Sequence, residues 1–280
     1  MNLILQGIHT DRAAIERLAA MADAKNIVTI HDHAYRCEDI SYTEEIKAHI
    51  EAESFAAKLD AAFVPPKLVL SDFKLVAMDM DSTLITIECI DEIADMQGLK
   101  PQVAAITEAA MRGEIEFRES LTRRVALLEG LDASALQRVY DERLQLSMGA
   151  ETMLAAVKAA GLKTLLVSGG FTFFTDRMKT RLGLDVTHSN VLEIRDGKLT
   201  GRVVNGIVDA EEKKATVERV CAAMGITPAE AIVMGDGAND LKMMDIAGLS
   251  VAFRAKPVVR AQADAALNFV GLDGILALFA

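Results

Sequence analysis

The fold of this chain is decided by one stretch, Lys74-Leu75-Val76-Ala77-Met78-Asp79-Met80-Asp81-Ser82-Thr83. Its first half is a short apolar run, which is typical of a strand buried in a parallel sheet. Asp79 and Asp81 follow the carboxyl end of that strand, where open α/β sheets bind their ligands. Two carboxylates this close together repel each other unless a cation compensates them, so the stretch indicates a divalent metal ion. A solvated turn with two acids is the alternative, and the remaining sequence decides between them.

Two later apolar runs also end in polar turns. One runs into Ser168-Gly169-Gly170 and the other into Gly235-Asp236-Gly237-Ala238-Asn239-Asp240, and helical patterns separate them. Strands that alternate with helices predict a doubly wound parallel sheet. Right-handed crossovers place the carboxyl ends of its strands on one edge. We therefore expect four side chains to meet at that edge: Asp79, Asp81, Ser168 and Asp236.

Two segments depart from this alternation. Residues 85–145 have the pattern of three or four helices, an insertion placed to act as a cap over the site. The pattern of residues 1–70 predicts a small α+β domain that ends at an extended Pro65-Pro66 linker. Residues 71–280 would then form the larger domain. Within the small domain we expect strands at 3–5 and 26–31, a helix at 11–24, and either one helix or two short ones at 43–62. His31-Asp32-His33 is a weak metal candidate, because adjacent strand residues point to opposite faces.

Composition excludes several classes of partner. The net charge is −11, which argues against nucleic acid, although a local cation site can still bind a small phosphorylated ligand. The three cysteines (Cys37, Cys89 and Cys221) have neither disulfide-framework nor zinc-site spacing. No apolar run has transmembrane length, and the start lacks a basic leader. We expect a cytoplasmic protein that binds no membrane.

The strand-end residues suit phosphoryl transfer. Asp79 is a candidate nucleophile, and Asp81 is a candidate general acid that becomes the base for the hydrolytic water. Asp236 would complete an oxygen-ligand site for Mg²⁺. Ser168 and the backbone N–H of Gly169 offer hydrogen-bond donors for a phosphate where a helix begins.

Lys213, in a helical segment between two of these motifs, is a candidate for neutralising a phosphate oxygen and the Asp79 carboxylate. Each of these elements also has an ordinary explanation. A Ser-Gly-Gly sequence is common at strand-to-helix turns, and a lysine among several charged neighbours usually lies on a solvated helix face. The order of the motifs along the chain favours the functional interpretation.

Taken together, Asp79–Thr83, Ser168-Gly169-Gly170, Lys213 and Gly235–Asp240 resemble the four ordered motifs of the haloacid dehalogenase-like hydrolase superfamily. From about residue 74 onward, the chain is most similar to the members that hydrolyse O-phosphoserine. The resemblance implies a Rossmann-like core with an inserted helical cap. It also implies that the Asp79 carboxylate, the Asp81 backbone carbonyl and Asp236 hold Mg²⁺. On the core side it implies that the substrate is bound by Ser168, Gly169, Lys213 and Asn239.

The resemblance assigns substrate recognition to the cap. It implies that Glu88 takes the amino group of the substrate and that Arg124 takes its carboxylate through a bidentate contact that Lys could not make. Met111 and Phe117 match the apolar closure of that pocket. By spacing alone, Glu88 and Arg124 would be ordinary surface charges on amphipathic helices.

The expected activity is hydrolysis of O-phosphoserine to L-serine and phosphate through an aspartyl-phosphate, the last step of L-serine biosynthesis. The alternatives are a phosphotransferase or phosphatase for another small phosphomonoester, and a non-catalytic amino-acid sensor. The sensor is disfavoured because both Asp79 and Asp81 are present. Residues 1–70 resemble the ACT-like regulatory domains that precede some relatives, but only weakly. An oligomerisation surface, as in a homodimer, or a structural appendage are the other interpretations of that domain.

Overall fold

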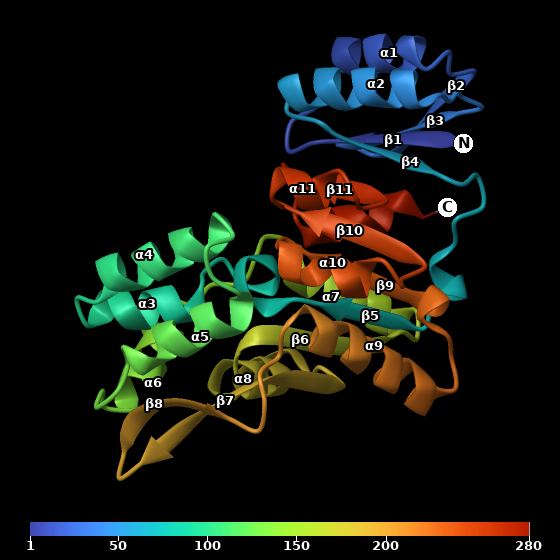
Figure 1. The fold of residues 1–280 in the computed structure, drawn as a ribbon. Coiled ribbons are helices and arrows are strands. Elements are labelled where there is room, and N and C mark those ends of the chain that lie inside the picture. The colour runs from blue at the N-terminus through green and yellow to red at the C-terminus, as the bar shows by residue number, and fades with distance from the viewer. Residues whose placement is uncertain (280) are drawn as a thin grey trace.

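The computed structural model describes residues 1–279, and of Met111 it describes the backbone alone. Across these residues the chain forms a small four-stranded sheet and a larger seven-stranded sheet. The small sheet stands at one end of the molecule, and a helical cap projects from the side of the larger sheet (Figure 1). This arrangement confirms the predicted α/β fold with an inserted cap and a small N-terminal α+β unit.

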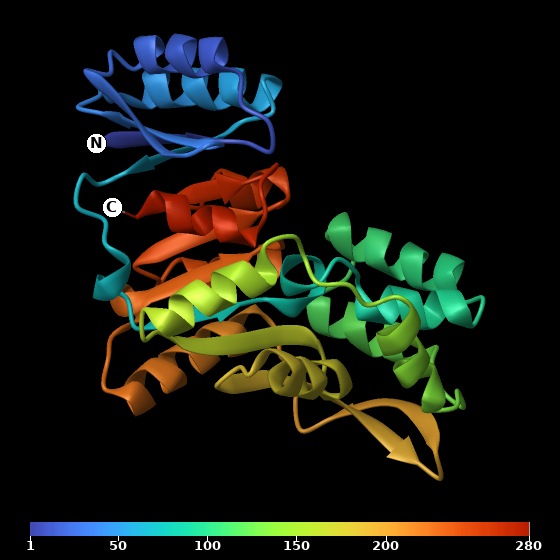
Figure 2. The same ribbon diagram turned by 180° about the vertical axis from the view of Figure 1, so that it is seen from behind.

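The N-terminal unit is an antiparallel sheet in the order β2-β3-β1-β4 with two helices on one face. Its strands are β1 (Asn2–Gln6), β2 (Asn26–His31), β3 (Ala34–Glu38) and β4 (Asp60–Val64). Its helices are α1 (Arg12–Met21) and α2 (Glu44–Ala56). The helices lie on the outer face, and the opposite face turns toward the C-terminal strands (Figure 1 and Figure 2).

Three details of this unit differ from the sequence prediction. The helix expected at 43–62 ends at Ala56, and its last residues instead form β4, because Ala61, Ala62 and Phe63 pair with β1. Strand pairing here overrides the helical preference of alanine. Strand β3 was not predicted. His31-Asp32-His33 forms the tight turn from β2 to β3, where Nδ1 of His31 accepts the N–H of His33.

The larger sheet has the order β11-β10-β9-β5-β6-β7-β8, and only the β7–β8 pair among the described strands is antiparallel. Its strands are β5 (Leu75–Met78), β6 (Lys163–Phe171), β7 (Val186–Arg195), β8 (Lys198–Val204), β9 (Ala231–Gly235), β10 (Leu249–Phe253) and β11 (Ala265–Leu267). The helices that cover it are α7 (Ala150–Ala159), α8 (Thr172–Leu182), α9 (Ala210–Met224), α10 (Leu241–Met244) and α11 (Pro257–Arg260). Short helical turns are η1 (Leu70–Asp72), η2 (Met80–Leu84), η3 (Pro228–Glu230), η4 (Ala238–Asp240) and η5 (Leu272–Leu278). Strand β5 lies between β6 and β9, so the opening stretch of sequence occupies the middle of the sheet.

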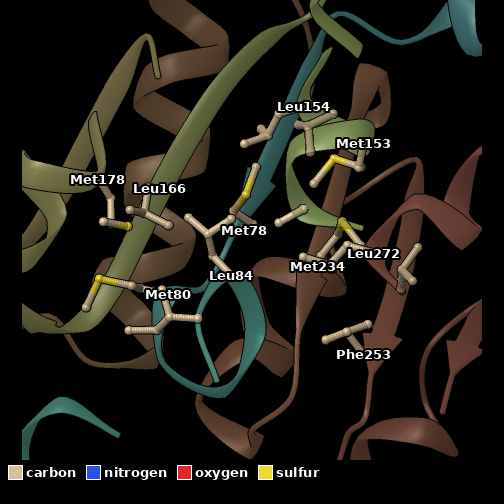
Figure 3. Packing of buried hydrophobic residues seen from close by; sticks show 14 of the residues in the cluster. Met78, Met80, Leu84, Met153, Leu154, Leu166, Met178, Met234, Phe253 and Leu272 are labelled. Atoms are coloured by element: carbon tan, nitrogen blue, oxygen red, sulfur yellow. The ribbon is translucent and has the colours of Figure 1, made fainter. Parts of the chain in front are cut away.

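Alternate residues of β5 enter two separate apolar layers. Val76 and Met78 pack in the cluster that includes α7, α8 and η5, and Figure 3 shows Met78 beside Leu154 and Leu166. Leu75 and Ala77 pack in the cluster on the other face, with α9, α10 and α11. Burial on both faces explains why β5 is a continuous apolar run rather than an alternating one.

The described part of the cap consists of four helices inserted between β5 and α7, as the helical pattern predicted. They are α3 (Cys89–Met96), α4 (Lys100–Met111), α5 (Phe117–Ala126) and α6 (Ser134–Glu142). Leu121 of α5 and Leu136 of α6 belong to the same apolar cluster as β5. The cap is therefore packed continuously with the core at its base.

The carboxylate of Asp60, on β4, joins the two sheets. It accepts backbone hydrogen bonds from Asn268 (2.7 Å), Phe269 (3.0 Å) and Val270 (3.1 Å), just past β11. The backbone just past the end of β11 at Leu267 is therefore bonded to the small sheet instead of continuing the strand. Within the described residues, no helix combines the length and apolar character needed to cross a membrane.

Candidate active site

The turn after β5 places Asp79 at the sheet edge. The N–H of Asp79 bonds to the carbonyl of Met234 in β9 (3.0 Å), and its Oδ1 accepts the N–H of Met80 (2.7 Å). The chain then turns sharply through Ser82, which adopts a left-handed φ of 57°. This is an uncommon conformation for a residue with a side chain, and strained backbone of this kind concentrates at functional sites.

A cavity of about 850 Å³ opens between this edge and the cap. Asp79, Asp81, Ser168 and Asp236 all line it, so the four strand-end residues converge as expected. The cap contributes further lining residues that the sequence had marked: Glu88, Phe117 and Arg124. Asn239, from the loop after β9, also reaches the cavity.

Lys213, on α9, reaches the nucleophile candidate from inside the protein. Its side chain is fully buried, and Nζ lies 2.9 Å from Oδ1 of Asp79 and 2.7 Å from Oδ1 of Asp240. Burial alone would lower the pKa of Lys213, but Asp240 and Asp79 outweigh it and raise that pKa above its usual value. The lysine is therefore a permanent positive charge beside Asp79.

Asp240 is a site residue that the sequence analysis quoted but did not assign. It is completely buried, and Oδ2 accepts the N–H groups of Asp236 (3.2 Å) and Gly237 (3.0 Å). Its carboxylate therefore fixes both the loop that carries Asp236 and the ammonium group of Lys213. A side chain at Gly235 would collide with it, since a Cβ there would lie 2.4 Å from Oδ2 of Asp240. The sequence feature that could have identified Asp240 is its position as the last acid of the glycine-rich motif Gly235–Asp240.

The acidic cluster has the donors that a hard divalent cation requires. Carboxylate oxygens of Asp79, Asp236 and Asp240 lie within 4.8 Å of one another. Burial, followed by repulsion from Asp240, raises the pKa of Asp236 to about 7. Both oxygens of Asp240 are already engaged, whereas Asp236 receives a 3.3 Å hydrogen bond from Thr83 Oγ1. Asp79 and Asp236 are thus the carboxylates with donor capacity left for Mg²⁺.

Asp81 has the properties of a proton donor. Burial, with repulsion from Glu88, raises the pKa of Asp81 to about 8, which favours its protonated form near neutral pH. Among the described residues its buried Oδ1 has no hydrogen-bond partner. The backbone of Gly170 packs against the other oxygen, because a Cβ there would lie 2.8 Å from Oδ2. This contact explains why glycine stands at position 170.

Ser168-Gly169-Gly170 lies inside β6, at an irregularity in its pairing with β7, and not in the turn that the sequence predicted; a residue that the sequence analysis missed holds this segment. Ser168 is buried and its Oγ accepts the N–H of Gly170 (2.8 Å). Asn190 donates from Nδ2 to the carbonyl of Gly169 (2.7 Å) and accepts the N–H of Val208 through Oδ1 (2.8 Å). No local motif marks Asn190, because both of its partners are distant in the sequence.

On the cap wall, Glu88 and Arg124 face the same cavity. Ser82 Oγ donates to Glu88 at 2.7 Å, and Arg124 donates from Nε to the carbonyl of Ser120 at 3.4 Å. Glu88 is accessible from the cavity, yet the surrounding walls desolvate it enough to raise its pKa. Burial lowers the pKa of Arg124.

An apolar side chain closes the cavity beside the Ser168–Gly170 segment of β6. Phe117 lies over Gly169, where an added Cβ would meet Cζ of the ring at 3.3 Å. The side chain of Met111, the other apolar residue expected there, lies outside the described part of the structure.

A family model for haloacid dehalogenase-like hydrolases matches residues 73–248. The chain is a haloacid dehalogenase-like hydrolase. This confirms the family inferred from the four motifs. The hydrolase is 60% identical over 218 residues to a phosphoserine phosphatase of Polaromonas sp. strain JS666, which covers 76% of this chain and 92% of that protein.

Solved structures match the hydrolase as well. A HAD family hydrolase of Salmonella enterica serovar Typhi superposes with a TM-score of 0.89 at 34% identity, covering 99% of this chain and 97% of that one. The structure described as a phospho-aspartyl intermediate analogue of phosphoserine phosphatase superposes with a TM-score of 0.70 at 37% identity. It covers 74% of the hydrolase and 99% of its own chain.

Proposed function

We propose that this hydrolase is a Mg²⁺-dependent phosphatase that converts O-phosphoserine to L-serine and phosphate, the last step of L-serine biosynthesis. One observation carries the proposal. A single cavity joins Asp79 and Ser168, which suit a phosphate together with the buried Lys213 beside Asp79, to a cap wall bearing Glu88 and Arg124, which suit an amino acid. The activity named for the 60% identical relative supports the same substrate.

In the first half-reaction the Asp79 carboxylate attacks phosphorus. A bond forms between a carboxylate oxygen and phosphorus while the bond from phosphorus to the serine oxygen breaks. Asp81 gives its proton to that oxygen, and serine leaves as the neutral alcohol. Lys213, 2.9 Å from Asp79, stabilises the carboxylate before attack and the negative phosphoryl oxygens during it.

In the second half-reaction the aspartyl-phosphate is hydrolysed. Asp81, now ionised, removes a proton from water as that water attacks phosphorus. The bond between phosphorus and Asp79 breaks, which restores the carboxylate and releases phosphate. Ser168 and the Gly169 N–H would hold the phosphoryl oxygens throughout.

The metal ion would be held by the Asp79 carboxylate, the Asp81 backbone carbonyl and Asp236. When bound, it supplies positive charge for the phosphate oxygens. The cluster of carboxylate oxygens within 4.8 Å supports this assignment. On the cap wall, Glu88 would take the substrate ammonium and Arg124 the substrate carboxylate, with Phe117 closing the pocket. Asn239 would contact the phosphate from the loop after β9.

We further propose a cytoplasmic location, in keeping with three unpaired, buried cysteines. For residues 1–70 we propose a regulatory or oligomerisation role, with two chains meeting at the open edge strand β2. Light scattering of the purified protein tests the homodimer directly, and a monomeric mass would reject it.

The deciding experiment measures phosphate release from O-phosphoserine and a panel of small phosphomonoesters, with Mg²⁺ and with a chelator. We expect the highest kcat/KM for O-phosphoserine and no turnover with the chelator. Adding homoserine as an acceptor separates hydrolysis from phosphotransfer. Formation of phosphohomoserine without inorganic phosphate would reject the phosphatase assignment.

A further inference from the structure

A second carboxylate lies beside the amino-acid end of the cavity. Asp91, in the first turn of α3, lines the cavity together with Glu88 and Arg124. The N–H of Asp91 donates to the carbonyl of Glu88 (3.1 Å), so the two acids are one helical turn apart. Residues with this spacing lie on the same side of a helix.

These three charges are incompletely paired by the protein. Among the described residues, Oδ1 of Asp91 is buried and has no hydrogen-bond partner. Arg124 is held by one long contact from Nε, which leaves its terminal amino groups for a ligand. A carboxylate buried without a partner is unfavourable, so a group from outside the chain that pairs with it would stabilise this wall of the cavity.

The charges around this wall indicate which charge a bound ligand should place beside each residue. Glu88 and Asp91 place two negative charges side by side, whereas the cations that act on Glu88 are Arg124 on the cap and Lys256 on the opposite, core side of the cavity. Asp91 acts on both neighbours: repulsion from Asp91 helps raise the pKa of Glu88, and attraction opposes the burial that lowers the pKa of Arg124. A ligand that brings a cation to Glu88 and Asp91 and an anion to Arg124 relieves both imbalances.

We propose that Asp91 is a specificity-determining residue that forms, together with Glu88, the subsite for the substrate's ammonium group. This rests on the proposed hydrolysis of O-phosphoserine and adds a second negative charge to its recognition. The site then selects substrates that carry an amino group over those that carry a neutral group at the same carbon. Arg124 remains the residue that selects the carboxylate.

A merely structural role for Asp91 predicts something different. If Asp91 only held Arg124 in place, its loss would weaken every substrate that carries a carboxylate. Two probes separate the cases. Phosphoethanolamine keeps the ammonium group and lacks the carboxylate, whereas 3-phosphoglycerate keeps the carboxylate and has a hydroxyl in place of the ammonium group.

The test compares wild-type protein with Asp91→Asn, a substitution of the same size. We expect kcat/KM for O-phosphoserine to fall at least about ten-fold, as the loss of a nearby charge in a partly solvated site implies. Binding of phosphoethanolamine, measured as competitive inhibition, weakens by a similar factor. The inhibition constant of 3-phosphoglycerate stays unchanged or improves. Asp95→Asn is the matched control, since Asp95 lies one turn further along α3, outside the cavity lining, and pairs with Lys100 and Arg143.

Two outcomes overturn the inference. One is equal weakening of phosphoethanolamine and 3-phosphoglycerate by Asp91→Asn, and the other is no change in either. Turnover of p-nitrophenyl phosphate by the variant verifies that it is folded. Should the wild-type protein fail to hydrolyse O-phosphoserine, the proposed function falls. The inhibition constants of the two probes, with p-nitrophenyl phosphate as substrate, then still decide the role of Asp91.

Discussion

Nε of Arg118, on the cap helix α5, donates a hydrogen bond to Oδ2 of Asp209, on the core, at 2.6 Å. Asp209 also caps α9 by accepting the N–H of Glu212 at 3.0 Å. Because α9 carries Lys213, this ion pair connects the cap to the helix that supplies charge to Asp79. Both residues line the cavity, so the pair spans it from cap to core.

Removing this connection is expected to weaken substrate binding modestly. Arg118 is more than half exposed, so Arg118→Gln should raise KM by about 2–5-fold, the range of an exposed ion pair, with little change in kcat. The difference in KM between the variant and the wild-type protein should become smaller as salt is added, because salt screens the ion pair. Arg123→Gln is the control, since Arg123 pairs with Glu119 on an exposed part of the same helix. A lower kcat with unchanged KM would contradict a role of this ion pair in substrate binding.

Lys213→Met is expected to lower kcat by about 10²–10³-fold, the usual loss for one preorganised charge. It also leaves Asp79 and Asp240 buried without their cation, which should reduce the free energy of unfolding by about 3–5 kcal/mol. Without the lysine, burial raises the pKa of Asp79 further in the folded state, so the loss of stability grows as pH rises. Steady-state kinetics and urea unfolding at several pH values, without Mg²⁺, measure both effects.

The neighbouring Lys214→Met provides the comparison, because Lys214 is only half-buried. It should keep both activity and stability. Equal losses in the two variants would show that Lys213 has no special place in the site.

Asp236→Asn tests the metal site. It should raise the Mg²⁺ concentration needed for half-maximal activity at least about ten-fold, since a neutral amide replaces one of the anionic ligands. Calorimetric titration of Mg²⁺ into the protein measures the same loss without turnover. Asp245→Asn, at an exposed position of similar charge, should bind Mg²⁺ as the wild type does. Unaltered Mg²⁺ affinity in Asp236→Asn would remove Asp236 from the metal site.

Asp60→Ala tests the junction between the two sheets. It leaves three backbone N–H groups just past β11 without a hydrogen-bond acceptor, so we expect the free energy of unfolding to fall by about 3 kcal/mol. Hydrogen exchange should accelerate at residues 268–270, while kcat stays unchanged. Asp72→Ala removes an exposed carboxylate and serves as the control. Unchanged exchange at 268–270 would mean that Asp60 does not hold the junction.

The sequence predicted the parts of the site that are encoded locally. An apolar run followed by acids marks a buried parallel strand and its carboxyl end, so Asp79, Asp81 and Asp236 could be placed at one edge before any coordinates. Asn190 and Asp209 could not be assigned to the site in this way. The partners of Asn190 lie far along the chain, and Arg118, the partner of Asp209, lies on the cap. Strand β4 was misassigned for the same reason: its alanines favour a helix, and only pairing with β1 makes them a strand.

The most direct test of the account is a single turnover of O-phosphoserine with Mg²⁺, quenched in acid and analysed by peptide mass spectrometry. The account predicts a transient phosphoryl group on Asp79 that decays as phosphate appears. In Asp79→Asn it predicts no phosphorylated peptide and turnover reduced by more than about a thousand-fold. Full turnover by Asp79→Asn, or phosphate release without phosphorylation of Asp79 at any time, would contradict it.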